Sequence, residues 1–561
     1  MLEEAPEFTA LSYTWDAQAR YRPLLIGEPP QQRRLNMTPN LEAYLRETQD
    51  REDARKVYDW RWIDAICINQ GDKKEKGEQV PRMREIYGKA ERIDIWLGAA
   101  KWYTHLAFTF MDNWKSLRGQ EDQSKVKRNF TKTDRMFYKK ERSPERIQQH
   151  EARIRRQNDD LASEMLKAIK DMARGYEELL NHDYWRRVWV FQEITTPKSD
   201  DSLTVCCGNH RAAWKYFKQI QPSNGRPDIH SKFNSILTPD EKRLFVEELA
   251  LIVDDLIGAY NNNIENLSSK SSERAGDAGD ADLATCETLE SCKVLQASDP
   301  RDKLYALLQL TKDRGIIPAN YDVSFSVESA YTNFAVAMIK DHKNLDILGC
   351  VGIQSTLNLP SWVPDWTSKN TAKYLERGDG ERREYHADAD IKAHPWVDDG
   401  ILHTCGFSLG TIRPHERSVE LDPGRHWYTF GLEGISTGDL ETEAHGHGPF
   451  LAHPLEKYHA FILLGSQYPV VLMNTPPPNK HRWSFVGEAY IEGVMRGNGF
   501  LRFVRKEVAE STPAGKFSDF ITCLDNKIAT HSVMEPVKGK EIVGKLKELG
   551  LSLNFTEVEI I

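Results

Sequence analysis

The segment YWRRVWVFQEI, Tyr184–Ile194, places one acidic side chain among aromatic and branched apolar residues. In a helix, the two tryptophans and Val188 of this segment share one face, and Glu193 lies at the edge of that face. A carboxylate at the edge of a buried apolar face is either paired with a cation or functional. Glu193 is therefore a candidate catalytic group, and a structural ion pair with Arg186 or Arg187 is the alternative.

Further polar and aromatic residues follow two segments with the composition of buried strands. Ser12, Tyr13 and Trp15 end the first segment, and Asn69 and Gln70 end the second. Ligands of parallel α/β sheets bind outside the carboxyl ends of the strands, so we expect these five residues to line a binding site. Their hydroxyl, amide and indole groups suit hydrogen bonds to a ribose or an amide and stacking on a flat ring. Turn formation by the amides and core packing by the tryptophan are the alternatives.

Two residues with reactive side chains lie inside the second segment, WIDAICI, Trp62–Ile68. Its near-continuous apolar character predicts a strand covered on both faces. Asp64 would then lie in the middle of the strand, where we expect a structural partner, with a position facing the site as the alternative. Cys67 is expected in the core, because no histidine stands nearby in the sequence to activate it.

The elements that would position these residues alternate between strand and helix over the first two hundred residues. Strands are predicted at Phe8–Tyr13, Trp62–Ile68, Ile93–Leu97 and Leu203–Cys207. Helices are predicted to begin at Thr38 and Asp183 and to span Val80–Ala90 and Leu106–Trp114. Short strand–helix–strand connections favour right-handed crossovers, so the predicted fold class is α/β with a mostly parallel sheet.

Composition divides the remainder of the chain. A charged insertion is expected at about 116–160 within a first domain of residues 1–207. A helical connector and linker is expected over 208–282, where the Ser-, Gly-, Ala- and Asp-rich stretch 268–282 is the clearest linker. Residues 283–561 are predicted to form an α+β region, with a helix near Asp299–Leu310, an aromatic turn at Pro360–Trp366 and β structure after Ile401.

Bulk composition excludes several classes of protein. A length of 561 residues indicates two or three domains, and a net charge of −9 argues against nucleic-acid binding. No signal peptide is visible, and no apolar run approaches the roughly 20 residues that a membrane helix needs. Eight cysteines without a CxxC pair indicate reduced thiols and a cytoplasmic protein. No HExxH motif is present, and no metal site is expected.

Four blocks of the N-terminal half resemble the heterokaryon-incompatibility (HET) domain family. They are LSYTW at Leu11–Trp15, WIDAICINQ at Trp62–Gln70, EQVPRMREIYGKAERIDIWLG at Glu78–Gly98 and YWRRVWVFQEI at Tyr184–Ile194. Three later blocks resemble the C-terminal parts of long HET proteins: SDPRDKLYALLQL at Ser298–Leu310, LPSWVPDW at Leu359–Trp366 and FVGEAYIEGVMRG at Phe485–Gly497. The resemblance therefore spans nearly the whole chain.

The resemblance implies both a fold and an activity. HET proteins trigger cell death when genetically different fungal hyphae fuse, and their domain is similar to Toll/interleukin-receptor (TIR) domains, several of which hydrolyse NAD. A TIR/flavodoxin-like sheet, no required cofactor and NAD as the substrate are therefore implied. In NAD-cleaving TIR domains the catalytic glutamate follows an aromatic residue in a W-x-x-x-E pattern, which Trp189 and Glu193 fit. The resemblance thus assigns the catalytic role to Glu193.

Three functions stay open from the sequence. The first is a death effector that hydrolyses NAD, and the second is a non-enzymatic signalling module that acts by oligomerisation. The third is an accessory protein of another pathway, such as a biosynthetic cluster. The expected partners are a second copy of the chain or an allelic or non-allelic incompatibility partner protein, with neither membrane nor nucleic acid.

Overall fold

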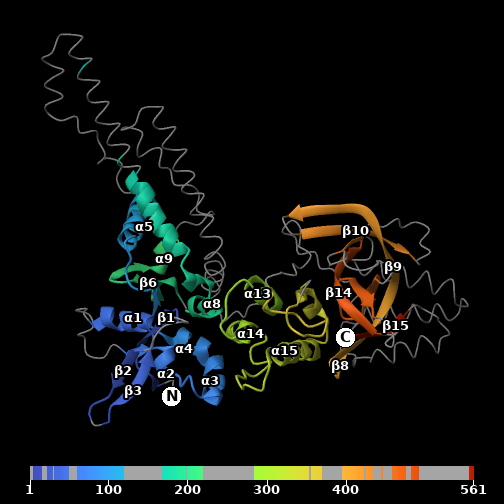
Figure 1. Ribbon diagram of the computed structural model, residues 1–561, viewed down its shortest axis with the longest axis horizontal. Coiled ribbons are helices and arrows are strands. Elements are labelled where there is room, and N and C mark those ends of the chain that lie inside the picture. Colours follow the sequence, from blue (N-terminus) through green and yellow to red (C-terminus); the bar gives the residue numbers. More distant parts are fainter. Residues whose placement is uncertain are drawn as a thin grey trace, which may run out of the picture. The chain divides into compact units, whose positions relative to one another are not determined.

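The computed structural model describes residues 4–15, 22–29, 31–49, 60–118, 149, 164, 167–197, 199–218, 284–352, 355–368, 395–422, 425–433, 444–446, 458–475, 482–491 and 555–561. The chain forms two compact units, Met1–Asp282 and Leu283–Ile561, which are described separately (Figure 1). Nearly all of the expected insertion at 116–160 and the whole of the expected linker at 268–282 lie outside the described residues.

The first unit is built on a five-stranded sheet in the order β4-β1-β5-β6-β7. The strands are β1 Phe8–Tyr13, β4 Trp60–Trp62, β5 Arg92–Trp96, β6 Leu203–Cys207 and β7 His210–Ala213. The first four strands run parallel to their neighbours, and β7 pairs with β6 in the antiparallel sense. A mostly parallel sheet within an α/β unit was the predicted class, and the pairing confirms it.

The sheet extends beyond residue 207, where the sequence predicts that the first domain ends. Gly208 makes this possible, because its φ of +55° suits the tight turn into β7. A Cβ atom at Gly208 would lie 2.5 Å from the Cβ of Ala100, and the Gly208 amide donates to the Gly98 carbonyl at 2.9 Å. The glycine thus joins the hairpin to the loop that follows β5.

Helices cover both faces of this sheet. They are α1 Pro39–Gln49, α3 Lys73–Gln79, α4 Met83–Lys89, α5 Thr104–Arg118, α8 Val188–Thr195 and α9 Trp214–Phe217. Alternation along β1 turns Leu11 towards Leu41 of α1, in one apolar cluster, and turns Ser12 towards α8 on the opposite face. The predicted start of α1 is confirmed, since the Leu41 amide donates to Thr38 Oγ1 at 3.2 Å.

The prediction of a strand over Trp62–Ile68 is wrong. Only β4, Trp60–Trp62, is a strand, and the helical turn α2, Asp64–Cys67, follows at once. The turn buries Ile63 and Ile68 at its two ends and leaves Cys67 exposed, so the expectation of a core cysteine is also wrong. A short apolar run carries too few periods to separate a strand from one turn of helix.

The continuous helix predicted from Asp183 onwards is also wrong. A 3-10 turn, Asp183–Arg186, is separated from α8 by Arg187, whose backbone is extended with φ −82° and ψ 135°. The break changes which residues share a face, and nearly every side chain of α8 is buried. A helix that is buried on nearly all sides lies in the protein interior, and its polar side chains then need partners.

A two-stranded hairpin of the first unit was not predicted. It consists of β2 Arg22–Ile26 and β3 Arg33–Met37, paired in the antiparallel sense. Leu24 packs against the apolar cluster beside α1, whereas Leu25 and Ile26 are 60 % and 43 % exposed. The hairpin therefore presents apolar side chains to solvent.

The second unit contains helices and a separate sheet, as predicted for an α+β region. The helices are α13 Thr285–Ser291, α14 Asp302–Leu308, α15 Val327–His342 and the 3-10 helix Asp346–Cys350. The sheet runs β10-β11-β14-β13-β12-β9-β15, with β8 also paired to β9, and all but one of its pairings are antiparallel. Its strands are β8 Trp396–Asp398, β9 Ile401–Asp422, β10 Arg425–Glu433, β11 Ala444–Gly446, β12 Tyr458–Leu463, β13 Val470–Asn474, β14 Arg482–Ile491 and β15 Phe555–Ile560.

Within the described ranges, no helix has the length and apolar character needed to cross a bilayer.

Candidate functional site

Glu193 lies on α8 with its carboxyl group turned towards β1. Its side chain is almost entirely buried, at 3 % exposure. The Ser12 hydroxyl donates to Glu193 Oε2 and also contacts the Tyr184 hydroxyl. Since the Ser12 proton goes to the carboxylate, Tyr184 must donate to Ser12 when Glu193 is ionised. A chain of two hydroxyl groups therefore holds the carboxylate in place.

Arg187 supplies the positive charge beside Glu193. It is the extended residue that separates the 3-10 turn from α8, and its guanidinium donates to the Tyr13 carbonyl at the end of β1. The break in the predicted helix thus turns Arg187 towards the end of the strand. Its charge lowers the pKa of both Glu193 and Asp64.

Burial nevertheless dominates the protonation of Glu193. Loss of solvent raises the pKa of Glu193 from its ordinary 4.5 to about 7. Arg187 and hydrogen bonds from Ser12 and Tyr87 oppose this shift, while the nearby Asp64 carboxylate adds to it. A carboxyl group with a pKa near neutrality can change its protonation state under physiological conditions.

Asp64 is a second acid at this site, which the sequence placed in the middle of a strand. Because β4 ends at Trp62, Asp64 lies at the carboxyl end of the strand and begins α2. Its carboxylate accepts the Ala65 amide at 2.7 Å and Trp15 Nε1 at 3.1 Å. Burial raises the pKa of Asp64 above its ordinary value, and Arg187 opposes that shift.

The two aromatic residues of the predicted site also meet here. Tyr13 is buried, its hydroxyl faces the Asp64 carboxylate, and burial raises its pKa. Trp15 is 37 % exposed and is held at its indole nitrogen by Asp64. The structure therefore brings together four of the predicted residues, Ser12, Tyr13, Trp15 and Glu193, and adds Asp64 and Arg187.

Asn69 and Gln70 lie farther along, in the turn that follows α2. Asn69 Oδ1 accepts the Gly71 backbone amide at 3.2 Å, and the backbone N–H of Asn69 donates to Glu75 Oε1 at 3.0 Å. Gln70 Nε2 donates to the Asp64 backbone carbonyl at 3.1 Å, so Gln70 contacts the backbone of Asp64 through this bond and not its carboxylate. The prediction that Asn69 and Gln70 end a strand is wrong, because β4 ends at Trp62 and the helical turn α2 lies between.

The site lies where the fold allows a ligand to approach. Counted in chain order within the sheet, the strands run 2-1-3-4-5, so the order reverses between β1 and β5. Ligands of open α/β sheets bind outside the carboxyl ends of strands at such a point. Tyr13 is the last residue of β1, Trp15 follows that strand, and Asp64 follows the neighbouring strand β4, at this edge of the sheet.

The arrangement combines two carboxyl groups, one guanidinium and an exposed indole. A carboxyl group whose pKa is raised to about 7, as for Glu193, can stabilise a developing positive charge when ionised or donate a proton when neutral. The exposed indole of Trp15 can stack on a flat ring. The site can therefore bind an aromatic ring and act electrostatically on a neighbouring atom.

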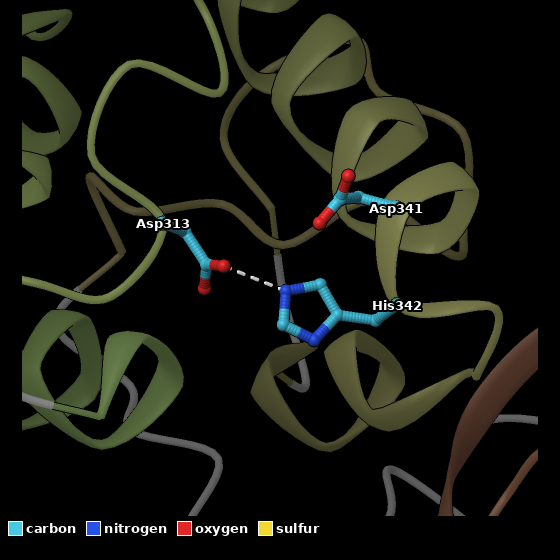
Figure 2. Close-up of side chains that lie close together, drawn as sticks. All are labelled: Asp313, Asp341 and His342. Carbon is cyan, nitrogen blue, oxygen red and sulfur yellow. Dashed lines mark hydrogen bonds and ion pairs between the residues drawn. The ribbon is translucent and has the colours of Figure 1, made fainter.

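One group in the second unit has side chains of the types that bind metal ions. Among the described residues, only Asp313, Asp341 and His342 bring three such ligand atoms within 4.8 Å of one another (Figure 2). His342 Nε2 lies 2.7 Å from Asp313 Oδ1, and the Thr285 hydroxyl donates to the other carboxylate oxygen. Both Asp313 oxygens are thus engaged, and the contacts are explained as a tie between α13 and α15.

The fold and the site describe an α/β domain with an acidic, partly aromatic site at the carboxyl edge of its sheet. Residues 8–193 of this domain match the family model described as heterokaryon incompatibility protein (HET). Residues 8–193 are therefore identified as a HET domain, and the matched segment ends at Glu193.

A curated relative carries a similar name. The chain is 25 % identical over 448 residues to "Heterokaryon incompatibility protein 6, OR allele" of Neurospora crassa. The alignment covers 72 % of this chain and 60 % of the relative, so this chain spans less than two thirds of that protein's length. No solved structure matches the chain.

Proposed function

We propose that this chain is a heterokaryon-incompatibility-type protein whose HET domain hydrolyses NAD and thereby triggers programmed cell death. The observation that supports this most is the carboxyl group of Glu193, which is buried, has its pKa raised to about 7 and is held by Ser12 near the end of the sheet where open α/β folds bind their ligands. A buried acid with a shifted pKa in such a place is a candidate for catalysis.

The proposed reaction breaks the bond between the nicotinamide nitrogen and the ribose carbon. The bonding electrons leave with nicotinamide, and positive charge builds on the ribose in an oxocarbenium-like transition state. Ionised Glu193 stabilises that charge, and water then attacks the ribose carbon. The products are nicotinamide, ADP-ribose and one proton, and no oxidant or reductant is needed.

The strand order supports a TIR-like pocket as part of this proposal. The order 2-1-3-4-5 is that of flavodoxin-like sheets, which bind their ligands at the switch beside the first strand. In this reading Trp15 stacks on the nicotinamide ring, and Ser12 and Tyr13 position the carboxyl groups. NAD is the substrate, no further cofactor is required, and the reaction takes place in the cytoplasm.

A signalling module without enzymatic activity is the second candidate. The exposed Leu25 and Ile26 of the β2–β3 hairpin favour it, because apolar side chains on a small hairpin suit contact with another protein. The partner would be a second copy or an incompatibility partner protein. In that case Glu193 and Ser12 would only fasten α8 to the sheet.

Expression of the full chain in fungal cells separates the two candidates. We expect the wild type to lower cellular NAD before viability falls, and Glu193→Gln to leave both unchanged at equal protein level. Glu178→Gln, which alters an exposed glutamate, is the matched control and should behave as the wild type. Cell death with constant NAD, or death caused equally by Glu193→Gln, would favour the signalling module.

A further inference from the structure

We propose that Asp64 and Trp15 form a subsite for a positively charged aromatic ring, so that the site selects oxidised nicotinamide, a pyridinium cation, over a neutral ring. This inference rests on the proposed function, since it concerns the substrate of the same site. It adds a specificity-determining residue, Asp64, that neither its strand-like sequence context nor the W-x-x-x-E pattern indicates.

The geometry of the pair is the first support. Trp15 Nε1 donates to Asp64 Oδ2 at 3.1 Å, which fixes the indole beside the carboxylate. The second carboxylate oxygen accepts the Ala65 amide at 2.7 Å, at the first turn of α2. These two donors and the Tyr13 hydroxyl are neutral, so they orient Asp64 without cancelling its charge. Because Trp15 is 37 % exposed, a ring can reach both groups.

The charge balance of the site is the second support. The charged groups that act on Asp64 and Glu193 include one cation, Arg187, and these two acids themselves. The guanidinium of Arg187 is also held by the Tyr13 carbonyl, near the buried acid. One guanidinium cannot compensate two carboxylates, so ionisation of both leaves these three groups with a net negative charge.

The charge of the proposed ligand complements this excess of negative charge. A pyridinium ring stacked on an indole gains a cation–π attraction, and a carboxylate at the edge of that ring adds a direct charge–charge attraction. Free nicotinamide has nearly the same flat shape but no charge, and the reduced ring is also uncharged. Since the ring loses its charge when the bond to ribose breaks, Asp64 favours substrate binding and the release of neutral nicotinamide.

Binding of two small probes to the full chain tests the inference apart from turnover. The probes are 1-methylnicotinamide, a cation, and nicotinamide, its neutral counterpart, with dissociation constants measured by ligand-detected NMR. We expect the wild type to bind the cation more tightly, and Asp64→Asn to weaken cation binding about tenfold while leaving nicotinamide unchanged. Asp183→Asn is the matched control, because Asp183 carries the same charge with a side chain 85 % exposed.

The outcomes separate this inference from the proposed function. Equal affinity for the two probes in the wild type, or an equal loss of both in folded Asp64→Asn, would overturn the subsite. If Asp64→Asn does not fold, the same binding measurement is made on Trp15→Leu, which changes an exposed residue. We expect this variant to bind the cation several-fold more weakly, and unchanged binding would overturn the subsite. Charge-selective binding without NAD cleavage would leave the subsite standing and remove the proposed hydrolysis.

Discussion

Glu193 occupies a buried position, where a carboxyl group is unfavourable unless it has a partner or a function. It is buried between α8 and β1 and accepts the Ser12 proton, with Arg187 and Asp64 nearby. A structural ion pair was the alternative in the sequence, and Arg187 does lie close. However, the Arg187 guanidinium also donates a hydrogen bond to the Tyr13 carbonyl, and burial still raises the pKa of Glu193. The residue is therefore an incompletely neutralised acid in the core.

This raised pKa predicts a pH-dependent gain in stability for Glu193→Gln. A pKa near 7 in the folded state, against 4.5 unfolded, means that the contribution of Glu193 to stability is complete below pH 4.5 and is lost as the pH rises through 7. The unfavourable ionisation reaches about 3 kcal/mol at alkaline pH. Glutamine cannot ionise, so the variant should gain stability relative to the wild type between pH 5 and pH 8.5.

Thermal unfolding of both proteins across that range measures the effect. Glu178→Gln, at an exposed position, should show no such trend. A difference between Glu193→Gln and the wild type that stays constant from pH 5 to pH 8.5 would contradict the account of Glu193 as a buried acid.

The sequence predicted Ser12, Tyr13 and Trp15 as site residues because strand ends can be recognised locally, and it predicted Glu193 from its apolar helix and from the W-x-x-x-E pattern of the family resemblance. Asp64 was predicted to have a structural role because its apparent strand ran on to Ile68. It lies at the carboxyl ends of the strands only because β4 ends early, at Trp62. Arg187 was considered only as an ion-pair partner. Its contact with the Tyr13 carbonyl joins positions 174 residues apart, and no local pattern contains that information.

At the scale of elements, strand ends were predictable where a glycine or a polar residue follows a short, largely apolar run. The bounds of β1 and β6 agree with the sequence for that reason. The strand predicted over Trp62–Ile68 is wrong because this segment forms one helical turn, with Ile63 and Ile68 buried at its ends. The hairpin β2–β3 was missed because it is exposed and lacks the alternation of a half-buried strand.

The residue that ends helix α15 allows a prediction about the stability of the second unit. Lys343, which follows the helix, has a left-handed backbone with φ 56°, a conformation that costs a non-glycine residue about 1 kcal/mol. Lys343→Gly should therefore stabilise the second unit by up to about 1 kcal/mol. Lys340→Gly, within the last turn of the same helix, should destabilise it by a similar amount.

Denaturant unfolding of both variants checks the prediction, since both lysines are exposed and lose the same side chain. A loss of stability at both positions would show that glycine acts only through the flexibility of the unfolded chain.

At the scale of the whole molecule, two units with separate sheets and separate cores predict two unfolding transitions. Residues Met1–Asp282 contain the five-stranded sheet, and Leu283–Ile561 contain the larger antiparallel one. Domains with their own cores unfold as cooperative units. We expect Glu193→Gln to move one calorimetric transition of the full chain and Lys343→Gly to move the other. A single transition displaced by both variants would mean that the units unfold as one.

The proposed function of the molecule depends on a single carboxyl group, and the release of nicotinamide by the purified full chain tests it most directly. At pH 8 the wild type should convert NAD to nicotinamide and ADP-ribose in equal amounts. Folded Glu193→Gln should lose at least about a hundredfold in rate, and Glu178→Gln should match the wild type. Equal rates for the wild type and Glu193→Gln, or no nicotinamide from the wild type at high protein concentration, would contradict the assignment of Glu193 as the carboxylate of an NAD hydrolase.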